Sequence, residues 1–401
     1  MRRQIRFVIP AERAGGAVLD FLASRFTYHT RAEWVERMAE GRIAVNGRRA
    51  DPEQALVAGD ALAYDAADIP EPPMDDRITL VYCDEDLAVV NKSGNLTCHP
   101  GGRYFNHTLW ALLKARHGIE SPIFVNRIDR ETSGIVLVAR TPKAARNLRA
   151  QFAGRTVEKR YLALVEGTFP ASCWAAGWIV ADFTGEVLKK RRFVRVASPE
   201  PDATHPIQDA IGLRGRPPAG SDTTVYIGHG GRSSSTPDRA RGARPSGSDQ
   251  TVCIDEGRAS SRAADAAPPE PDAQWALTAF RLLEQHGPIS LIEACPHTGR
   301  LHQIRVALQT LGFPLVGDKM YGADPGIFLR FCKDALTRED LTRMRMKRQA
   351  LHAAGLRFCH PRTGRTMAFD LPFPEDMQAV IQELDFPGKG KRLVRERTAL
   401  S

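Results

Sequence analysis

The sequence predicts an α+β fold: a small N-terminal α/β module followed by a larger domain with a mixed or antiparallel sheet. Short strand-like runs recur along residues 76–385, separated by only a few segments of helical periodicity. Strands and helices do not alternate regularly, which argues against a β-α-β series with a parallel sheet. With 401 residues the chain is long enough for two or three domains, each with its own core.

Two helices are predicted in the N-terminal module, residues 1–68. The first is indicated by apolar residues at helical spacing, namely Val18, Leu19, Leu22 and Phe26. The second is predicted over residues 30–40. It has Thr30 at the N-cap, Glu33 at the capping-box position and Gly41 just after its end, which are residue types that favour helix termini.

Short strands complete this module. Residues 42–49 contain Asn46-Gly47, the pair that a type I′ hairpin turn prefers, so they predict two strands joined by a tight turn. Gly59-Asp60 marks a further turn before the strand-like residues 61–64. The predicted order is therefore helix, helix, hairpin, strand.

A stiff polar connector separates the module from the rest of the chain. Pro70-Glu71-Pro72-Pro73 places the boundary at a linker of residues 69–75, which leads into a domain over residues 76–385. Strand-like runs in this domain lie at residues 78–82, 87–91, 135–139, 161–166 and 290–294, and a helix is expected at 108–117.

Residues 199–272 interrupt this domain. They are rich in Pro, Gly, Ser, Arg and Asp and poor in apolar residues, so they cannot bury enough surface to offset the loss of chain entropy. Residues 218–225 are nearly repeated at 245–252, but two copies do not make a solenoid. We interpret the segment as a flexible insertion, with a pair of hairpins as an open alternative, and residues 386–401 as a basic tail.

Composition narrows the class of protein. The net charge of +9 and the pI near 9.3 favour a polyanionic partner, although any single basic run is as well explained by a solvated face. No apolar run reaches the roughly 18 residues of a membrane helix, and the N-terminus lacks the apolar region of a signal peptide. Seven cysteines without a C-x-x-C pair predict reduced thiols, a cytoplasmic protein and no zinc site.

Three segments stand out as candidates for chemistry. Residues 126–134, NRIDRETSG, come directly before an apolar strand, and residues 158–167, EKRYLALVEG, form another strand-like run. The third segment, PHTGRLHQIRV at residues 296–306, continues to Gly317-Asp318 and Tyr321-Gly322. Thr298 is expected to cap a helix with Ile304, Leu308 and Leu311 on its apolar face and Gly312 at its end.

Together these segments resemble, in order and spacing, the RluA-type pseudouridine synthases over residues 75–195 and 273–377. The usual form of the first run in that family is H-R-L-D-x-x-T-S-G. The resemblance implies that Asp129 is the catalytic carboxylate, that Tyr161 stacks on an extruded uracil and that Arg305 pairs with the aspartate. Asn126 and Ala307 stand where many members of the family have His.

The resemblance also implies which residues contact the substrate and what is not required. Metal ions and redox cofactors are not expected. Contacts to the flipped nucleotide and its phosphates would come from the remaining motif residues: Asn126, Arg127, Thr132, Lys159, Arg300, His302 and Gln303.

The N-terminal module resembles the ribosomal S-four-type RNA-binding domain, on the anchors Gly41, Val45-Asn46-Gly47 and Gly59-Asp60. In that family the second helix and the hairpin grip RNA. The resemblance therefore implies phosphate contacts by five arginines: Arg31, Arg37, Arg42, Arg48 and Arg49. A generic small domain whose arginines face water remains the alternative.

The implied reaction explains why these residue types are needed. Isomerising uridine requires breaking the bond between the ribose and the ring nitrogen, turning the base and rejoining it through carbon 5. An aspartate serves as nucleophile or as base, a neighbouring arginine keeps it ionised, and an aromatic ring holds the flipped base. The expected substrate is RNA, with large-subunit ribosomal RNA first and transfer RNA second, and the expected state is a monomer.

Two other functions fit parts of the sequence. The first is a non-catalytic RNA-binding or ribosome-assembly factor with the same fold. The second is a carboxylate hydrolase acting on nucleosides or glycosides, which usually needs two carboxylates flanking the bond, whereas the motifs mark only Asp129. Intact Asp129, Tyr161 and Arg305 favour the isomerase.

Overall fold

The computed structural model describes residues 4–26, 29–66, 70–184, 187, 190–196, 223–226, 268–322 and 324–385. The chain forms two compact units. One consists of Met1–Ile78 with Asn95–Pro122, and the other of Thr79–Gly94 with Ile123–Ser401. The predicted tail and most of the predicted insertion lie outside the described residues.

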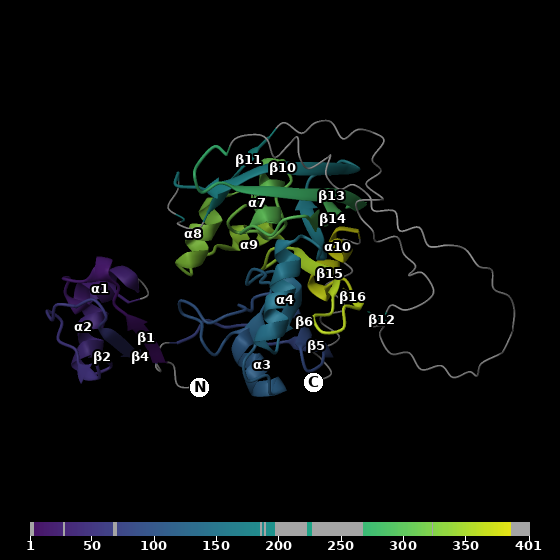
Figure 1. Ribbon diagram of the computed structural model, residues 1–401. Coiled ribbons are helices and arrows are strands. Elements are labelled where there is room, and N and C mark those ends of the chain that lie inside the picture. The colour runs from purple at the N-terminus through teal and green to yellow at the C-terminus, as the bar shows by residue number, and fades with distance from the viewer. Residues whose placement is uncertain are drawn as a thin grey trace, which may run out of the picture. The chain divides into compact units, whose positions relative to one another are not determined.

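The first unit contains a small antiparallel sheet with strand order β1-β4-β2-β3, in the purple part of Figure 1. Its strands are β1 (Gln4–Val8), β2 (Ile43–Val45), β3 (Arg48–Arg49) and β4 (Ala61–Asp65). The helices are α1 (Val18–Arg25) and α2 (Arg31–Ala39) with a short 3-10 turn, η1 (Ala11–Arg13), before them. Trp34, Tyr64 and Leu22 lie fully buried in its core.

The helix cap and the hairpin turn predicted in this unit are present in the structure. Thr30 and Glu33 form the expected capping box of α2, and Gly41 adopts a φ of 74° beyond its end. Asn46 and Gly47 both have positive φ, at 51° and 78°, as a type I′ turn requires. The described part of the predicted N-terminal module contains both helices and strands, which confirms its α/β character.

The remaining part of the first unit includes α3 (Leu109–His117). Thr108 is the N-cap of this helix, and Gly118, in the left-handed region, is its C-cap. In the predicted linker, the carboxylate of Glu71 accepts hydrogen bonds from the backbone N–H groups of Phe105, Asn106 and His107, at 2.7, 2.8 and 2.8 Å. These bonds fix the connector to the segment before α3. The domain division at residues 69–75 stays a prediction.

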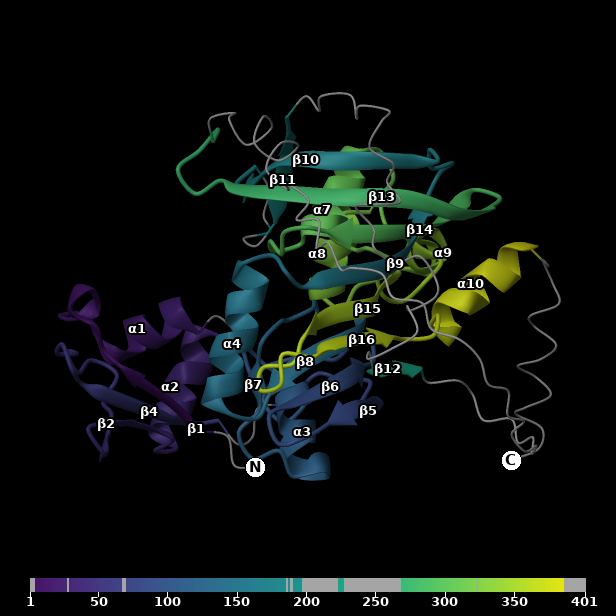
Figure 2. The ribbon, with the colours of Figure 1, turned by 45° about the vertical axis from the view of Figure 1, so that its right-hand side comes forward.

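The second unit is built on a large mixed sheet, whose strands Figure 2 shows one below another from β10 to β5. The strand order is β11-β10-β13-β14-β9-β15-β8-β6-β5, with β16 beside β15 and β7 beside β8. Neighbouring strands from β11 to β6 are antiparallel except for β8 with β15, and β12 runs parallel to β16. This arrangement confirms the α+β class with a mixed sheet.

The strands of this unit have the following bounds: β5 (Ile78–Cys83), β6 (Leu87–Lys92), β7 (Ile123–Phe124), β8 (Ser133–Ala139), β9 (Glu158–Glu166), β10 (Ser172–Ala181), β11 (Arg191–Arg195), β12 (Thr223–Tyr226), β13 (Gln274–His286), β14 (Ile289–Pro296), β15 (Leu351–Cys359) and β16 (Thr366–Asp370). All five strand-like runs of the sequence are strands. Within the predicted insertion, β12 pairs with β16 in parallel.

Helices cover the sheet and contribute side chains to three apolar clusters. They are α4 (Pro142–Ala153), α7 (Gln303–Thr310), α8 (Gly326–Cys332), α9 (Arg338–Met344) and α10 (Glu375–Asp385). Leu148 of α4 packs with β6 and β8, while Ile304 and Leu308 of α7 pack with β9, β13 and β14. Since β8 and β9 both border β15, the motifs they carry come to the middle of the sheet.

The predicted start of α7 is wrong. The helix begins at Gln303 with His302 as its N-cap, and Thr298 does not cap it. The Thr298 hydroxyl instead donates to the Gln303 side chain at 2.7 Å and accepts from the Leu277 N–H at 3.1 Å. Gly312, with a φ of 87°, does stand just after the helix end.

Candidate active site

The first motif forms the loop between β7 and β8. Asn126, where the resembling family commonly has His, uses its side-chain oxygen to accept a hydrogen bond from the Leu137 N–H at 2.7 Å. The Asp129 carbonyl accepts from the Thr132 N–H at 3.2 Å, which makes the loop turn before β8. Asn126 therefore fastens the loop to the strand, and its side-chain oxygen faces the backbone.

Gly134 sets where this loop meets β15. It has a φ of 110°, and a Cβ at this position would lie 2.2 Å from the carbonyl oxygen of Ala353. Only glycine allows such a conformation together with so close an approach. The glycine that ends the motif is thus required by the parallel pairing of β8 with β15.

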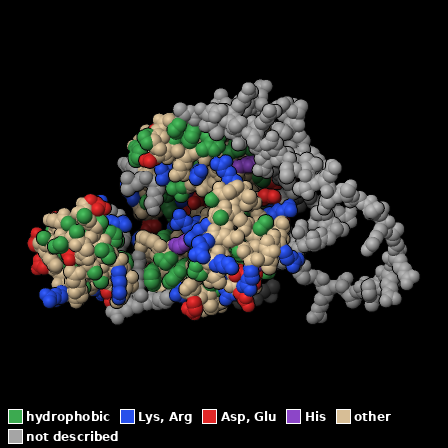
Figure 3. Space-filling model, viewed as in Figure 1, with side chains coloured by type: hydrophobic (Ala, Val, Ile, Leu, Met, Phe, Trp, Pro, Cys, Tyr) green, Lys and Arg blue, Asp and Glu red, His purple; other side chains and the backbone are tan. Residues whose placement is uncertain are grey.

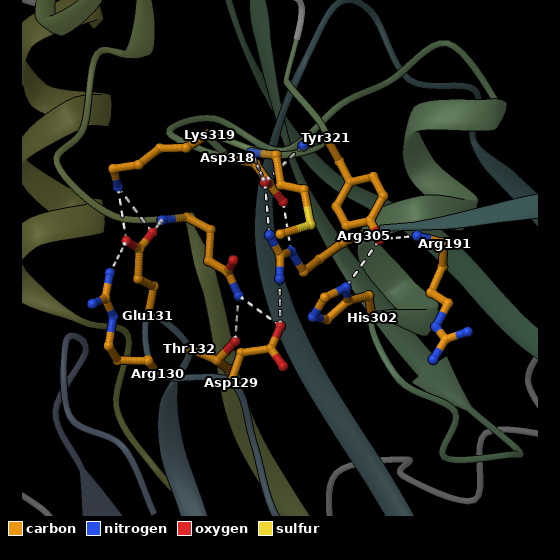
Figure 4. Close-up of polar contacts among 12 residues, drawn as sticks. Asp129, Arg130, Glu131, Thr132, Arg191, His302, Arg305, Asp318, Lys319 and Tyr321 are labelled. Atoms are coloured by element: carbon orange, nitrogen blue, oxygen red, sulfur yellow. Dashed lines mark hydrogen bonds and ion pairs between the residues drawn. The ribbon is translucent and has the colours of Figure 1, made fainter. Parts of the chain in front are cut away.

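The carboxylate of Asp129 lies against the guanidinium of Arg305 from α7, as Figure 4 shows. Arg305 donates from Nη1 to Asp129 Oδ2 at 2.7 Å. Its Nε and Nη2 donate to the two oxygens of Asp318 at 2.7 and 2.9 Å. The arginine therefore bridges two carboxylates. It donates two hydrogen bonds to Asp318 and one to Asp129. The predicted pairing of Arg305 with Asp129 is present in the structure.

These contacts determine the charge state of the carboxylates. Burial alone would raise the pKa of Asp129, but the nearby Arg305 more than offsets it and holds that pKa below its ordinary value. The same balance of burial against Arg305 lowers the pKa of Asp318, which also accepts from the N–H groups of Met320 and Tyr321. The pKa of Arg305 is raised, because its two carboxylates outweigh its burial. All three groups are charged at neutral pH.

One oxygen of Asp129 remains available. The side chain is 26% exposed, although Arg305 and Asp318 are buried. Both hydrogen bonds from described residues, from Arg305 and a longer one of 3.4 Å from Gln349, reach Oδ2, and none reaches Oδ1. An ionised carboxylate with one unpartnered oxygen is suited to act as a nucleophile or as a base.

Three residues that sequence reasoning missed complete the surroundings of Asp129. Gln349 donates to the Thr132 hydroxyl at 2.6 Å. Asp318 orients Arg305, and Lys319 pairs with Glu131 at 2.9 Å (Figure 4). Thr132 and Gln349 are buried, so they act on the shape of the loop. Asp318 stood within a segment already marked by the resemblance, whereas no sequence signal marked Gln349.

Tyr161 lies on β9, beside β15 and β14. Its ring packs against the core cluster of the second unit and remains partly exposed. Burial, together with the smaller effect of the charge of Asp129, raises the pKa of Tyr161 to about 12. The phenol is therefore neutral and close enough to Asp129 to sense its charge.

The residues of the third segment have different surroundings. Gln303 is buried, and its amide bonds to Thr298, Arg300, Leu277 and Thr278, which favours a structural role. His302 lies partly exposed near Asp129, with Nδ1 2.9 Å from the Tyr321 hydroxyl (Figure 4). Gln303 thus stabilises the surrounding backbone, whereas the neighbouring His302 lies near Asp129.

Four basic residues of the second unit form a further group: Lys159, Arg155, Arg300 and Arg127. Lys159 donates to the Thr298 carbonyl at 3.0 Å and Arg300 to the Trp275 carbonyl at 3.1 Å. Burial, together with the smaller effects of Arg155 and Arg300, lowers the pKa of Lys159 to about 8. Lys159, Arg155, Arg300 and the exposed Arg127 have no acidic partner among the described residues. Such uncompensated charge is suited to an anion.

The arginines of the first unit differ in their availability. Arg31 pairs with Asp20 and Arg42 with Glu40. Arg49 donates to the carbonyls of Met38 and Ala39, and Arg37 donates to the Tyr64 hydroxyl at 3.1 Å and to His29. Arg48 is exposed on β3.

One group of residues in the described part of the chain has the composition of a metal site. Ligand atoms of Asp84, Asp86 and His360 lie within 4.8 Å of one another. They already bond to protein groups, with His360 2.8 Å from Asp84, Tyr82 donating to Asp84 at 2.7 Å and Arg362 donating to Asp86 at 2.5 Å. This group fastens turns of the sheet and contains none of the motif residues.

Six cysteines fall within the described residues, and all are free. In the same part of the chain no helix is long and apolar enough to cross a membrane.

Known proteins are similar to this chain over most of its length. The family model described as RNA pseudouridylate synthase matches residues 86–310. An uncharacterized RNA pseudouridine synthase of Chlorobaculum parvum is 29% identical over 376 residues, 91% of this chain and 92% of that protein. Ribosomal large subunit pseudouridine synthase D of Neisseria meningitidis is 27% identical, over 95% of this chain and 82% of its own length.

A third relative, ribosomal large subunit pseudouridine synthase C of Vibrio vulnificus, is 26% identical over 96% of this chain and 98% of its own. The family match covers more than half of the chain, including the loop of Asp129, Tyr161 and Arg305. The chain therefore belongs to the RNA pseudouridylate synthase family and is a pseudouridine-forming isomerase.

Proposed function

We propose that the chain is an RluA-type enzyme that isomerises specific uridines in structured RNA, with Asp129 as its catalytic carboxylate. The observation that carries this assignment is the single bond from Arg305 to Asp129 Oδ2, which leaves Oδ1 without a partner among the described residues. Asp318 already takes two donors of Arg305. The arginine thus keeps Asp129 ionised without occupying both of its oxygens.

The remaining residues divide the other tasks of the reaction. The bond from ribose C1′ to uracil N1 breaks with its electron pair on the base, and the base turns and rejoins through C5; C5 then loses its proton and N1 gains one. Asp129 acts on the sugar as nucleophile or base, while the partly exposed ring of Tyr161 holds the flipped base. A neutral Tyr161, with its pKa at about 12, serves as an aromatic surface without competing for protons.

Cationic residues of the second unit would bind the RNA backbone. Lys143, Arg146 and Arg149 are exposed on α4, which contains no acidic residue. Arg155 follows this helix, and Lys159 and Arg300 lie beyond it in the uncompensated group described above. Figure 3 shows Lys and Arg side chains gathered on this face of the second unit. Such surfaces bind phosphates without regard to sequence.

The substrate we propose is ribosomal RNA of the large subunit, with transfer RNA as the second choice. Two of the relatives carry names that place their action on the large subunit. We further propose that residues 1–68 are an S-four-type module that adds RNA contacts, with the exposed Arg48 as its clearest candidate. The family match begins at residue 86 and does not include this module. A monomer in the cytoplasm remains our expectation.

The experiment that tests the catalytic assignment compares the purified wild type with Asp129→Asn on uridine-labelled ribosomal and transfer RNA. We expect the wild type to form pseudouridine. The rate of formation should fall on the order of 10⁴-fold in the variant, because the substitution removes the charged carboxylate that reacts. Equal product from the two proteins would overturn the role of Asp129. Released uracil in place of pseudouridine would favour the hydrolase.

Mapping pseudouridines in RNA from cells with and without the protein tests the substrate. We expect one or a few large-subunit positions to lose pseudouridine. Loss confined to transfer RNA would reverse the order of our two substrates.

A further inference from the structure

His302 has a backbone conformation that its helix does not need. It is the N-cap of α7, where an extended conformation is usual, yet its φ is 58° and its ψ is 18°. Its side chain caps no N–H group of the helix. A non-glycine residue in the left-handed region costs free energy and is often found where function sets its position. Its imidazole instead contacts the Tyr321 hydroxyl, with Nδ1 2.9 Å from that oxygen.

Tyr321 determines which nitrogen of His302 carries the proton. The Tyr321 side chain is fully buried, and its hydroxyl accepts a hydrogen bond from the Arg191 N–H at 2.8 Å. The hydroxyl proton then has one acceptor among the described residues, His302 Nδ1 at 2.9 Å. Neutral His302 therefore accepts at Nδ1 and carries its proton on Nε2.

The second nitrogen of the ring is directed toward the reaction site. In Figure 4 the His302 ring lies between Tyr321 and Asp129, with Nε2 on the side of Asp129. Nε2 has no hydrogen-bond partner among the described residues. The charged groups that act on the ring are Asp129, Arg305, Asp318 and Arg191, two of each sign. Their effects oppose one another, so burial decides and lowers the pKa of His302 to about 4.

We propose that the Nε2–H of His302 donates a hydrogen bond to a carbonyl oxygen of the target uracil, and that Tyr321 is the positioning residue that holds this proton on Nε2. The inference rests on the proposed role of Asp129. When the bond between C1′ and N1 breaks, the electron pair stays on the base and spreads over its two carbonyl oxygens. A donor fixed beside Asp129 stabilises this charge as it develops.

A neutral donor suits this reaction better than a charged one. The departing base must keep its electron pair in order to attack C1′ again through C5. An imidazolium would transfer its proton to the base and weaken that attack, whereas a neutral imidazole shares its proton and keeps it. Protonation at Nδ1 would also leave the buried Tyr321 proton without an acceptor. The structure thus opposes the charged form of His302.

The test compares His302→Gln with His302→Asn. The Gln amide nitrogen takes the place of Nε2, while the shorter Asn does not reach it but tolerates the left-handed backbone. We expect His302→Asn to lower kcat on the order of 10²-fold with little change in KM, and His302→Gln to recover most of that loss. Wild-type kcat in the Asn variant, or an equal loss in both variants at matched melting temperatures, overturns the proposal.

Tyr321→Phe tests the positioning role. Without the hydroxyl neither tautomer of neutral His302 is favoured, so Tyr321→Phe should lower kcat in the wild type but have little further effect in His302→Gln, whose amide has no tautomers. A purely structural role would give the same loss in both backgrounds, and that result overturns the assignment of Tyr321. The Asp129→Asn variant distinguishes a failure of the proposed function from a failure of the inference about His302. If Asp129→Asn remains active, the proposed function fails; if it is inactive while His302→Asn is normal, only this inference fails.

Discussion

At the scale of single residues, the arrangement around Arg305 determines how Asp129 can react. A guanidinium has five N–H donors in a rigid plane, and Asp318 takes two of them in a bidentate pair. Asp129 receives one donor only. A second bond to Asp129 would stabilise its charge further and make it a poorer nucleophile or base. Asp318 therefore controls the strength of the interaction between Arg305 and Asp129.

Asp318→Asn should harm both stability and activity. The variant leaves a buried guanidinium with one carboxylate instead of two, and breaking a buried ion pair costs about 3 kcal/mol. We expect a loss of that order in the free energy of unfolding, measured with urea, and a lower rate in single-turnover assays. Glu339→Gln removes a carboxylate that pairs with Arg343 on the surface of α9, so it is the matched control. Equal stability of the two variants would contradict the role of Asp318.

At the scale of elements, the site depends on how two strands and one helix are placed in the second unit. The loop of Asp129 precedes β8, Tyr161 lies on β9, and α7 brings Arg305 from a segment 176 residues away. The strand β15 lies between β8 and β9 and pairs with both. Its pairing with β8 is short and depends on Gly134.

Gly134→Ala should disrupt this pairing. The new Cβ would lie 2.2 Å from the Ala353 carbonyl oxygen, in a backbone conformation with a φ of 110°. We expect a loss of more than about 3 kcal/mol in the free energy of unfolding, or no folded protein. Gly299→Ala is the control, because open space surrounds that position. A fully stable Gly134→Ala protein would show that β8 and β15 can separate without cost.

The exposed face of α4 should contribute to RNA affinity through charge alone. We expect Lys143→Glu with Arg146→Glu to weaken RNA binding about tenfold or more and to reduce the dependence of the dissociation constant on salt. The rate at saturating RNA should remain unchanged, because neither residue lies in the Asp129 network. Arg343→Gln, which removes an ion-paired cation of α9, is the control. An unchanged salt dependence would place the RNA elsewhere.

At the scale of the whole molecule, buried histidines make stability depend on pH. Burial lowers the pKa of His302 to about 4 and that of His352 to about 3. In the unfolded chain the pKa of both side chains is about 6.5. Between these values the unfolded state binds protons that the folded state does not. Stability must therefore fall as pH drops below about 6.5, before Asp129 and Asp318 become protonated.

The measurement is the urea midpoint of unfolding at pH 7.5 and pH 5. We expect a lower midpoint at pH 5 for the wild type. His117→Gln should show the same pH dependence, because this exposed side chain of α3 is not buried in the folded state. A midpoint independent of pH would mean that His302 and His352 are protonated in the folded protein.

Much of the local structure was predictable because it depends on residues close together in sequence. The capping box of Thr30 and Glu33 and the turn at Asn46-Gly47 are examples, since their partners lie within three residues. The start of α7 was not predictable in this way. Thr298 has the chemistry of a cap, but Leu277 and Gln303 engage its hydroxyl, and the strain at His302 places the helix start four residues later.

By itself the sequence determined the class of fold, the order of the strands along the chain, the motif that holds Asp129 and the pairing residue Arg305. These follow from local patterns and from a resemblance carried by three segments. Only the tertiary structure decided that Asp318 holds Arg305 through two bonds, that Gln349 reaches Thr132 across 217 residues, and that Tyr321 orients His302. Such contacts depend on strand order and helix placement, so no pattern of neighbours along the chain can specify them.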